Sequence, residues 1–218
     1  MGIAETAKQT KKASIQLAAV KTSVKNAALT QIAKALQQNS LQIISANEKD
    51  LAAAKKTNLA APLLKRLVFD KSKIADVCSG IESLIKLDDP VGQTLTATEL
   101  DKGLELYKVT CPIGVIGVIF ESRPDALVQI STLCLKSGNA VLLKGGSEAE
   151  HTNKILADVI AKAAVSAGLP DGWLQLLHSR PNQRLLPPSF CSGQALIPSC
   201  RLVKSGTGCS TYSRRRTS

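Results

Sequence analysis

The chain has 218 residues with 44% hydrophobic and 21% charged side chains, the balance of a folded globular protein, which excludes wholesale disorder. Aromatic residues make up only 3%, which argues against a nucleic-acid-binding module that stacks bases on aromatic side chains. The net charge of +11 suggests an anionic partner, but residues 181–218 contribute +6 of it and the other 180 residues only +5.

The first ninety residues predict helices. Apolar residues recur at helical spacing over residues 24–36, and a second helix fits residues 41–56. Pro62 suits the first turn of a short helix, and Asp70 can cap another helix whose buried stripe runs from Ile74 to Ile85. No stretch resembles a signal-peptide core or a membrane span, so we expect a cytoplasmic protein without a membrane partner.

From residue 94 the apolar period changes from 3.6 to 2, which predicts a β-hairpin that turns at residues 101–103. Continuous apolar runs then predict buried parallel strands at residues 115–120, 140–143 and 173–177. Helices over residues 125–136 and 147–166 separate them, the second capped by Ser147. We therefore predict an α/β fold in which N-terminal helices and a hairpin precede an incomplete parallel, Rossmann-like sheet.

Residues 181–218 differ from the rest of the chain. They contain six basic residues, no acidic residue, four of the nine prolines and no periodic apolar pattern. Cys191, Cys200 and Cys209 lack a fourth ligand for a closed zinc site, so we expect no metal. The sequence thus predicts a folded part over residues 1–180 and a tail without regular structure over residues 181–218.

Two strand-to-helix turns can carry a binding site, because ligands bind beyond the carboxyl ends of strands in open α/β sheets. The first turn contains Arg123, which can bind an anion at a helix start or simply pair with Glu121 or Asp125. The second turn contains Lys144, Gly145, Gly146, Ser147 and Glu148. Its glycines let a ligand approach the backbone, although a plain glycine turn explains the same residues equally well.

Residues 112–124 and 135–149, with their Glu-Ser-Arg-Pro and Leu-Lys-Gly-Gly-Ser-Glu segments, resemble the γ-glutamyl phosphate reductase family of the aldehyde dehydrogenase superfamily. The resemblance extends from about Glu5 to about Leu177 and includes residues 46–51 and 89–92. It implies NADPH-dependent reduction of L-glutamyl 5-phosphate to L-glutamate 5-semialdehyde in L-proline biosynthesis, through a cysteine thioester.

The resemblance also implies roles for individual residues. Lys144 would contact the ribose or 2′-phosphate of the cofactor's adenosine, with residues 145–148 beside it, and Arg123 would bind the substrate anion. The hairpin over residues 94–110 would match the strands through which the superfamily oligomerises.

One feature of this family is missing from the sequence. Its nucleophilic cysteine lies within an Asn-Ala/Gly-Cys-Asn-like motif in a second α/β domain, and no cysteine here has such surroundings. We therefore assign no catalytic residue and expect residues 1–180 to be a truncated NADP-binding domain that is inactive alone. We expect the tail to be a translation of another reading frame or of retained non-coding sequence.

Two alternatives stay open beside the reductase. One is a non-catalytic fragment that binds a nucleotide or oligomerises. The other is a nucleic-acid binder that uses the basic tail around Arg214, Arg215 and Arg216, which the aromatic-poor core disfavours.

Overall fold

The computed structural model describes residues 2–121, 123–177 and 200–204, the last group by its backbone alone. The helices are α1 (Ile3–Ala18), α2 (Thr22–Gln38), α3 (Ser40–Lys56), α4 (Ala61–Leu67), α5 (Lys71–Lys86), α6 (Pro124–Lys136) and α7 (Glu150–Ser166), with a short 3₁₀ turn η1 (Ser147–Ala149) before α7. The strands are β1 (Thr94–Asp101), β2 (Leu104–Val109), β3 (Val115–Ile119), β4 (Ala140–Lys144), β5 (Leu174–Leu176) and β6 (Cys200–Lys204).

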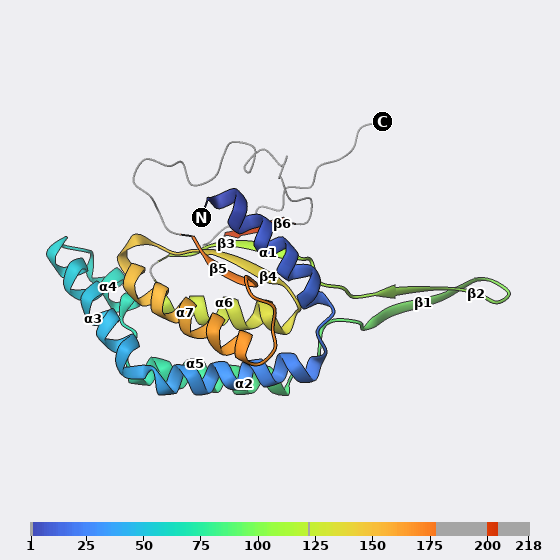
Figure 1. Ribbon diagram of the computed structural model, residues 1–218, viewed down its shortest axis with the longest axis horizontal. Helices are drawn as coiled ribbons and strands as arrows, with labels where there is room; N and C mark the ends of the chain where they lie inside the picture. The colour runs from blue at the N-terminus through green and yellow to red at the C-terminus, as the bar shows by residue number, and fades with distance from the viewer. Residues whose placement is uncertain (1, 122, 178–199, 205–218) are drawn as a thin grey trace.

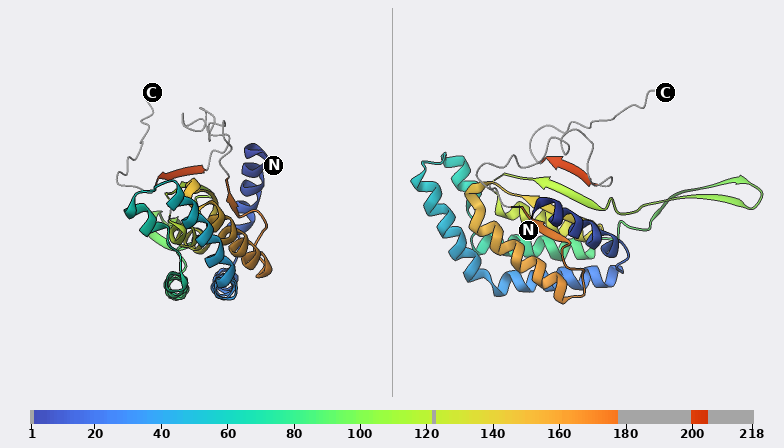
Figure 2. Two further views of the ribbon diagram at one scale, coloured as in Figure 1. Left: turned by 90° about the vertical axis from the view of Figure 1, so that its left-hand side faces the viewer. Right: turned by 45° about the horizontal axis from the view of Figure 1, so that its top comes forward.

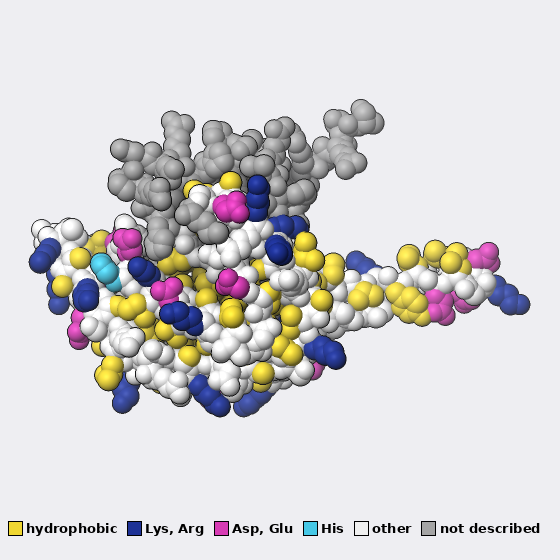
Figure 3. Space-filling model, viewed as in Figure 1, with side chains coloured by type: hydrophobic (Ala, Val, Ile, Leu, Met, Phe, Trp, Pro, Cys, Tyr) yellow, Lys and Arg dark blue, Asp and Glu magenta, His cyan; other side chains and the backbone are white. Residues whose placement is uncertain are grey.

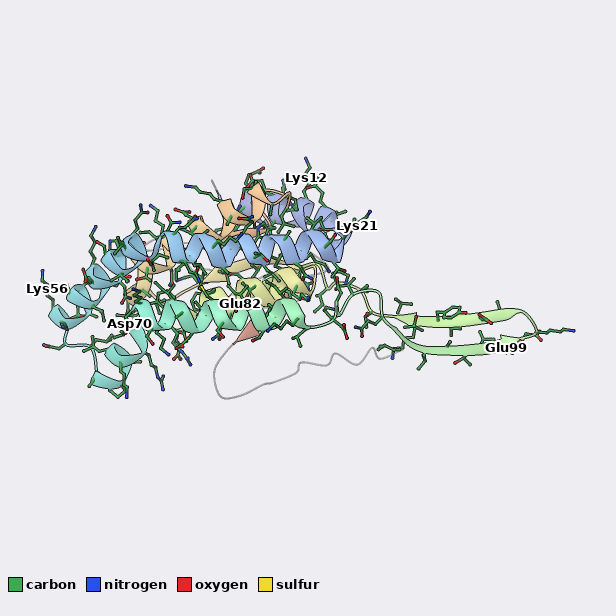
Figure 4. All side chains as sticks on the ribbon, turned by 90° about the horizontal axis from the view of Figure 1, so that it is seen from below. Lys12, Lys21, Lys56, Asp70, Glu82 and Glu99 are labelled. Atoms are coloured by element: carbon green, nitrogen blue, oxygen red, sulfur yellow. The ribbon has the colours of Figure 1, made fainter. Side chains whose placement is uncertain are left out.

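The helices follow the local signals of the sequence closely. The apolar stripe of α2 is fully buried at Leu29, Ile32 and Leu36. The Asp70 carboxylate caps α5 by accepting a hydrogen bond from the Lys73 N–H at 2.9 Å, and this residue lies at the start of the helix in Figure 4. Proline occupies the first turn of α4, where its missing N–H costs no helical hydrogen bond.

The main sheet is parallel with strand order β5-β4-β3-β6, and the hairpin β1-β2 forms a separate antiparallel pair. Strand β3 therefore has β4 on one side and β6 on the other, so the direction of strand addition reverses at β3. This reversal creates a topological switch point at the carboxyl ends of β3 and β6.

Strand β6 lies within the segment for which the sequence predicts no regular structure. Its backbone pairs in register with β3, from Val115 opposite Cys200 to Ile119 opposite Lys204. A strand edge offers a row of backbone N–H and C=O groups, and a short extended segment can pair with it through backbone atoms alone. Such pairing leaves little periodic signal in the side chains, so sequence pattern did not predict it.

The elements stack in four layers (Figure 1). Helix α1 crosses one face of the sheet, α6 and α7 cover the other face, and α2 with α5 forms an outer layer beneath them (Figures 1 and 2). Helix α3 packs against α7 and contacts its first turn, close to the carboxyl ends of the strands, and α4 packs against α3.

One continuous apolar core runs through these layers. It includes Leu17 of α1, Leu143 of β4, Ile160 of α7 and Trp173 just before β5, all fully buried. Every helix in the described part of the chain is too short or too polar to cross a membrane.

The hairpin β1-β2 projects away from this body (Figure 1), and every residue in both strands is exposed. Apolar side chains nevertheless recur along it, as Figure 3 shows. The large ones are Leu95, Leu100, Leu104, Leu106, Tyr107 and Val109.

The rest of the tail, residues 181–199 and 205–218, lies outside the described residues. This applies to Cys191, Cys209 and the Arg214–216 cluster, and to the side chain of Cys200.

Candidate functional site

The carboxyl ends of β3, β4 and β5 meet at one edge of the sheet. The Phe120 N–H donates to the Lys144 carbonyl at 3.0 Å, and the Leu177 N–H donates to the Leu143 carbonyl at 2.7 Å. These bonds hold the segments after the three strands side by side, as the parallel topology predicts. The turn at residues 144–147, which we call the glycine turn, lies at the centre of this edge.

The glycine turn has no room for a side chain at its first glycine. A Cβ atom built on Gly145 would collide with the side-chain Nδ2 of Asn153 and approach Cζ of Phe120 to 3.1 Å. The Lys144 ammonium folds back over the turn and donates to the Gly145 carbonyl at 2.8 Å. A side chain at position 145 would therefore have to displace Asn153 and Phe120, and Lys144 places a cation beside this glycine.

A cavity of about 90 Å³ adjoins the glycine turn. It is lined by Lys144, Gly145, Gly146, Ser147, Glu150, Asn153, Leu176 and Leu177. Four of the five residues that the sequence assigned to a cofactor site therefore line one cavity, and Glu148 does not.

The prediction that Ser147 caps the following helix is wrong. Ser147 begins the 3₁₀ turn η1, α7 begins only at Glu150, and neither start is capped by its own N-cap side chain. The cap comes from Asp50 of α3, whose carboxylate accepts from the backbone N–H groups of His151 at 3.2 Å and Thr152 at 2.8 Å. Sequence pattern missed it because the donors and the acceptor are about a hundred residues apart.

Asp50 is the centre of a buried network that joins α3 to α7. Its carboxylate also accepts from the Thr152 hydroxyl at 2.6 Å and lies 2.7 Å from His151 Nδ1. Asn47, one turn earlier on α3, donates to the Thr152 hydroxyl and to the Leu67 carbonyl, and accepts from the Phe69 N–H. We call Asn47, Asp50, His151 and Thr152 the α3–α7 junction.

The junction limits what the start of α7 can bind. The positive end of a helix attracts anions through its free N–H groups, but two of those groups already donate to Asp50. A bound phosphate would have to rely on Lys144 and the glycine turn instead.

Asn153 is a site residue that the sequence analysis missed. It is 2% exposed, lines the cavity, and neither atom of its amide has a hydrogen-bond partner in the described structure. It also lies on the buried stripe of α7, followed at helical spacing by Leu156, Ala157 and Ile160. A polar residue on an apolar stripe is the sequence signal that could have identified it.

Arg123 lies just before α6 at the end of β3, and its guanidinium pairs with the Asp125 carboxylate at 3.0 Å. The neighbouring Glu121 lies 3.9 Å from Arg66. The local pairing that the sequence left open is therefore present, yet the Arg123 side chain remains 55% exposed with further donors available.

The described cysteines do not form a nucleophilic site. Burial raises the pKa of the Cys78 thiol, and it raises the pKa of Cys134 to about 12, so both favour the unreactive thiol. Cys111 is exposed, but it does not line the cavity beside the glycine turn. The described residues also contain no group of three or more His, Cys, Asp or Glu side chains arranged to hold a metal ion.

Comparison with known proteins gives consistent results. Residues 3–185 match the aldehyde dehydrogenase family. A γ-glutamyl phosphate reductase from Acetivibrio thermocellus is 63% identical over 180 residues, which are 83% of this chain and 42% of that protein.

Two solved structures share the fold. The γ-glutamyl phosphate reductase of Thermotoga maritima superimposes with a TM-score of 0.84 at 30% identity, over 93% of this chain and 48% of that one. The enzyme of Saccharomyces cerevisiae gives a TM-score of 0.77 at 41% identity, over 81% and 46% of the two chains. The chain thus spans less than half the length of these relatives.

Proposed function

Because the chain belongs to the aldehyde dehydrogenase family, we propose that it is the cofactor-binding part of a γ-glutamyl phosphate reductase. The reaction would be the NADPH-dependent reduction of L-glutamyl 5-phosphate to L-glutamate 5-semialdehyde in L-proline biosynthesis, in the cytoplasm. The observation that carries this proposal is the 63% identity over 180 residues to a relative of that name.

We expect the glycine turn to bind part of a nicotinamide dinucleotide, the cofactor class of this family. A cavity of about 90 Å³ adjoins the turn, and Lys144, Gly146 and Ser147 are among the residues that line it. Lys144 supplies the cation that a 2′-phosphate needs, which favours NADPH over NADH. Gly145, Gly146 and Ser147 would line the adenosine side of the site, with Glu148 next to them in the 3₁₀ turn.

The chain's own residues would bind and orient the reactants. Lys144 would pair with the cofactor phosphate, and the exposed donors of Arg123 would bind the substrate anion at the end of β3. NADPH supplies the hydride that reduces the acyl group. Cys78 and Cys134 are buried as neutral thiols. We therefore expect the chain to bind the cofactor without forming a thioester on either cysteine.

A thermal-unfolding titration of the 218-residue chain tests this function. We expect NADPH to raise the melting temperature, with a stabilisation of about 2.7 kcal/mol at a hundred times its dissociation constant. Lys144→Met should weaken NADPH binding much more than NADH binding, because only NADPH carries the 2′-phosphate. Absence of stabilisation by either dinucleotide would refute the proposal, and NADPH oxidation with glutamyl phosphate would refute the expected lack of turnover.

A second function, oligomerisation, is supported by the hairpin. Both of its strands are exposed, and large apolar side chains recur along it. Such a surface is typical of a protein–protein interface. We propose that β1-β2 joins copies of this chain, which analytical ultracentrifugation with and without the hairpin would test.

A further inference from the structure

Two legs of chain, residues 88–93 before β1 and residues 110–114 after β2, connect the hairpin to the body. The legs are bonded to each other. The Gly92 N–H donates to the Thr110 carbonyl at 2.9 Å, and the Thr110 N–H donates to the Gln93 carbonyl at 2.9 Å. The hairpin therefore leaves the body as one unit, and contacts that hold the legs also determine its direction.

Helix α2 holds the first leg through Asp89. The Asp89 carboxylate lies 2.5 Å from the Lys25 ammonium and accepts from the Thr22 hydroxyl at 2.6 Å. Within the leg, the same carboxylate accepts from the Val91 N–H at 3.0 Å, and the Gln93 side chain donates to the Asp89 carbonyl at 2.7 Å. Asp89 thus joins the shape of the leg to the position of α2.

The turn between α6 and β4 contacts both legs. A Cβ atom built on Gly138 would lie 3.0 Å from Pro112 in the second leg and 3.7 Å from Val91 in the first. The next residue, Asn139, accepts from the Gly114 N–H at 2.9 Å. The two legs are therefore seated on the same turn of the body.

Two buried lysines join these attachments. Lys25 is 2% exposed, and besides pairing with Asp89 it donates to the Lys136 carbonyl at the end of α6, at 3.3 Å. Lys136 is 3% exposed and donates to Asn26 of α2 at 2.9 Å and to the Ile85 carbonyl near the end of α5 at 3.2 Å. The carbonyl ends of α5 and α6 attract cations, so both ammonium groups lie where helix ends stabilise them. We call Lys25, Lys136 and Asp89 the lysine lock.

The lysine lock is an unusual way to fill the interior of a protein. Lysine is seldom fully buried, and a buried charge is costly unless partners are placed around it. Among the described residues, Asp89 is the one carboxylate that pairs with either lysine, so two buried cations share a single anion. Apolar residues would fill the same space in many arrangements, whereas these charges are satisfied only when the first leg brings Asp89 to them.

We propose that the lysine lock holds the hairpin in one direction relative to the body before any partner binds. Its benefit rests on the proposed self-association of this chain through the hairpin. A hairpin already held in its binding direction loses less orientational freedom when a second copy joins it, which strengthens association. Lys25, Lys136 and Asp89 are then positioning residues, since they lie outside both exposed strands.

Distances between two spin labels test the direction of the hairpin in the 218-residue chain. The labels replace Lys12 on α1 (Figure 4) and Lys102 at the hairpin turn, which are both exposed. Non-canonical amino acids carry them, because the chain has six cysteines. A dilute sample with Leu106→Ser ensures that no second copy holds the hairpin. We expect one narrow distance distribution with the intact lock and a distribution at least about twofold broader in Asp89→Asn, since both buried lysines then lack an anion.

Two control variants separate the lock from a general loss of stability. Asp50→Ala, at the α3–α7 junction, should weaken folding at least as much but leave the distribution narrow, and so should Asp88→Asn, the exposed neighbour of Asp89. Lys25→Gln provides a second disruption if Asp89→Asn does not fold. A broad distribution with the intact lock, a narrow one in the folded lock variant, or equal broadening in Asp50→Ala overturns the proposal.

Sedimentation measures the consequence for association, without the Leu106→Ser substitution. Asp89→Asn should raise the dissociation constant of self-association about tenfold, as expected when about one hairpin in ten points in the binding direction. Unchanged self-association with a released hairpin overturns the role of the lock in association. If the unmodified chain does not self-associate, the proposed oligomerisation fails, whereas the spin-label distances still decide whether the lock exists.

Discussion

The α3–α7 junction and the β1-β2 hairpin are opposite kinds of structure within one chain. At the junction, a single buried carboxylate serves two backbone N–H groups, a hydroxyl and an imidazole. In the hairpin, strands β1 and β2 pair with each other, and no residue in either strand is buried. The junction is stabilised by contacts inside the chain, whereas the hairpin presents apolar side chains that remain exposed in the described part of the chain.

This difference separates residues that hold the fold from residues available for binding. Substitutions in the first group should lower the free energy of unfolding, and substitutions in the second group should leave it unchanged. The glycine turn lies between these extremes, because its backbone is tightly packed while its cavity is available to a ligand.

The largest expected effect is at Asp50. Asp50→Ala removes the acceptor for four buried or half-buried donors, so we expect the free energy of unfolding to fall by about 3 kcal/mol. Urea unfolding monitored by circular dichroism measures this change. Glu48→Ala, an exposed acidic residue on the same helix, should change it by less than about 0.5 kcal/mol. Equal effects of the two substitutions would contradict the role of the junction.

The next effect is at Asp89, which anchors the start of the hairpin to α2. Its carboxylate lies 2.5 Å from the buried Lys25 ammonium and also accepts from the Thr22 hydroxyl and the Val91 N–H. Burial acts to raise the pKa of Asp89, but these hydrogen bonds and the Lys25 charge outweigh burial and lower it below its usual 3.8. The ionised carboxylate therefore stabilises the folded state above about pH 4, and this stabilisation is lost as the pH falls through the lowered pKa.

Asp89→Asn should accordingly cost about 2 kcal/mol at pH 7, because Lys25 loses its charged partner. The difference from the unmodified chain should shrink as the pH falls below about 4, where the native carboxyl also becomes neutral. Urea unfolding at several pH values measures both. The exposed neighbour Asp88 provides the control, since Asp88→Asn should show neither effect.

Two glycine substitutions give smaller effects of opposite sign. Gly145→Ala places a methyl group against Asn153 and Phe120, so we expect a loss of about 1.5 kcal/mol and weaker NADPH binding. Gly80→Ala lies within α5 with nothing within 4 Å of the new methyl group, so it should stabilise by about 0.7 kcal/mol. Urea unfolding compares the two, and a stabilising Gly145→Ala would show that the turn is looser than described.

The smallest effect on folding is expected in the hairpin. Leu106→Ser should change the free energy of unfolding by less than about 0.5 kcal/mol, because the side chain is 56% exposed. The same substitution should weaken self-association in sedimentation experiments if the hairpin joins copies of the chain. A large loss of folding stability in a dilute, monomeric sample would contradict this account of the hairpin.

Local sequence signals predicted most of the fold. Asp70, Pro62 and the apolar stripe of α2 act through neighbours within about one or two helical turns, so their effect is visible along the chain. The same holds for the buried strands β3 and β4, whose continuous apolar runs indicate burial on both faces. Strand β6 was not predicted, because its pairing with β3 uses backbone atoms that every residue has.

The candidate site was predicted only in part. The position of Lys144 and the two glycines after a buried strand was enough to place a turn at the binding edge of the sheet. The cap of α7 was assigned to Ser147, whereas the structure gives it to Asp50, because the fold brings a carboxylate from α3 to the start of α7. The incomplete hydrogen bonding of Asn153 was invisible to sequence pattern for the same reason.

By itself, then, the order of residues determined most of the helices and strands, though not β6, since those choices depend on interactions between near neighbours. The tertiary structure alone decided which buried polar groups find partners, since the partners of Thr152 and Lys25 lie 102 and 64 positions away along the chain, at Asp50 and Asp89. It decided in the same way that Asn153 remains unpaired beside a cavity, because satisfying a buried amide depends on atoms that only folding brings within hydrogen-bonding distance.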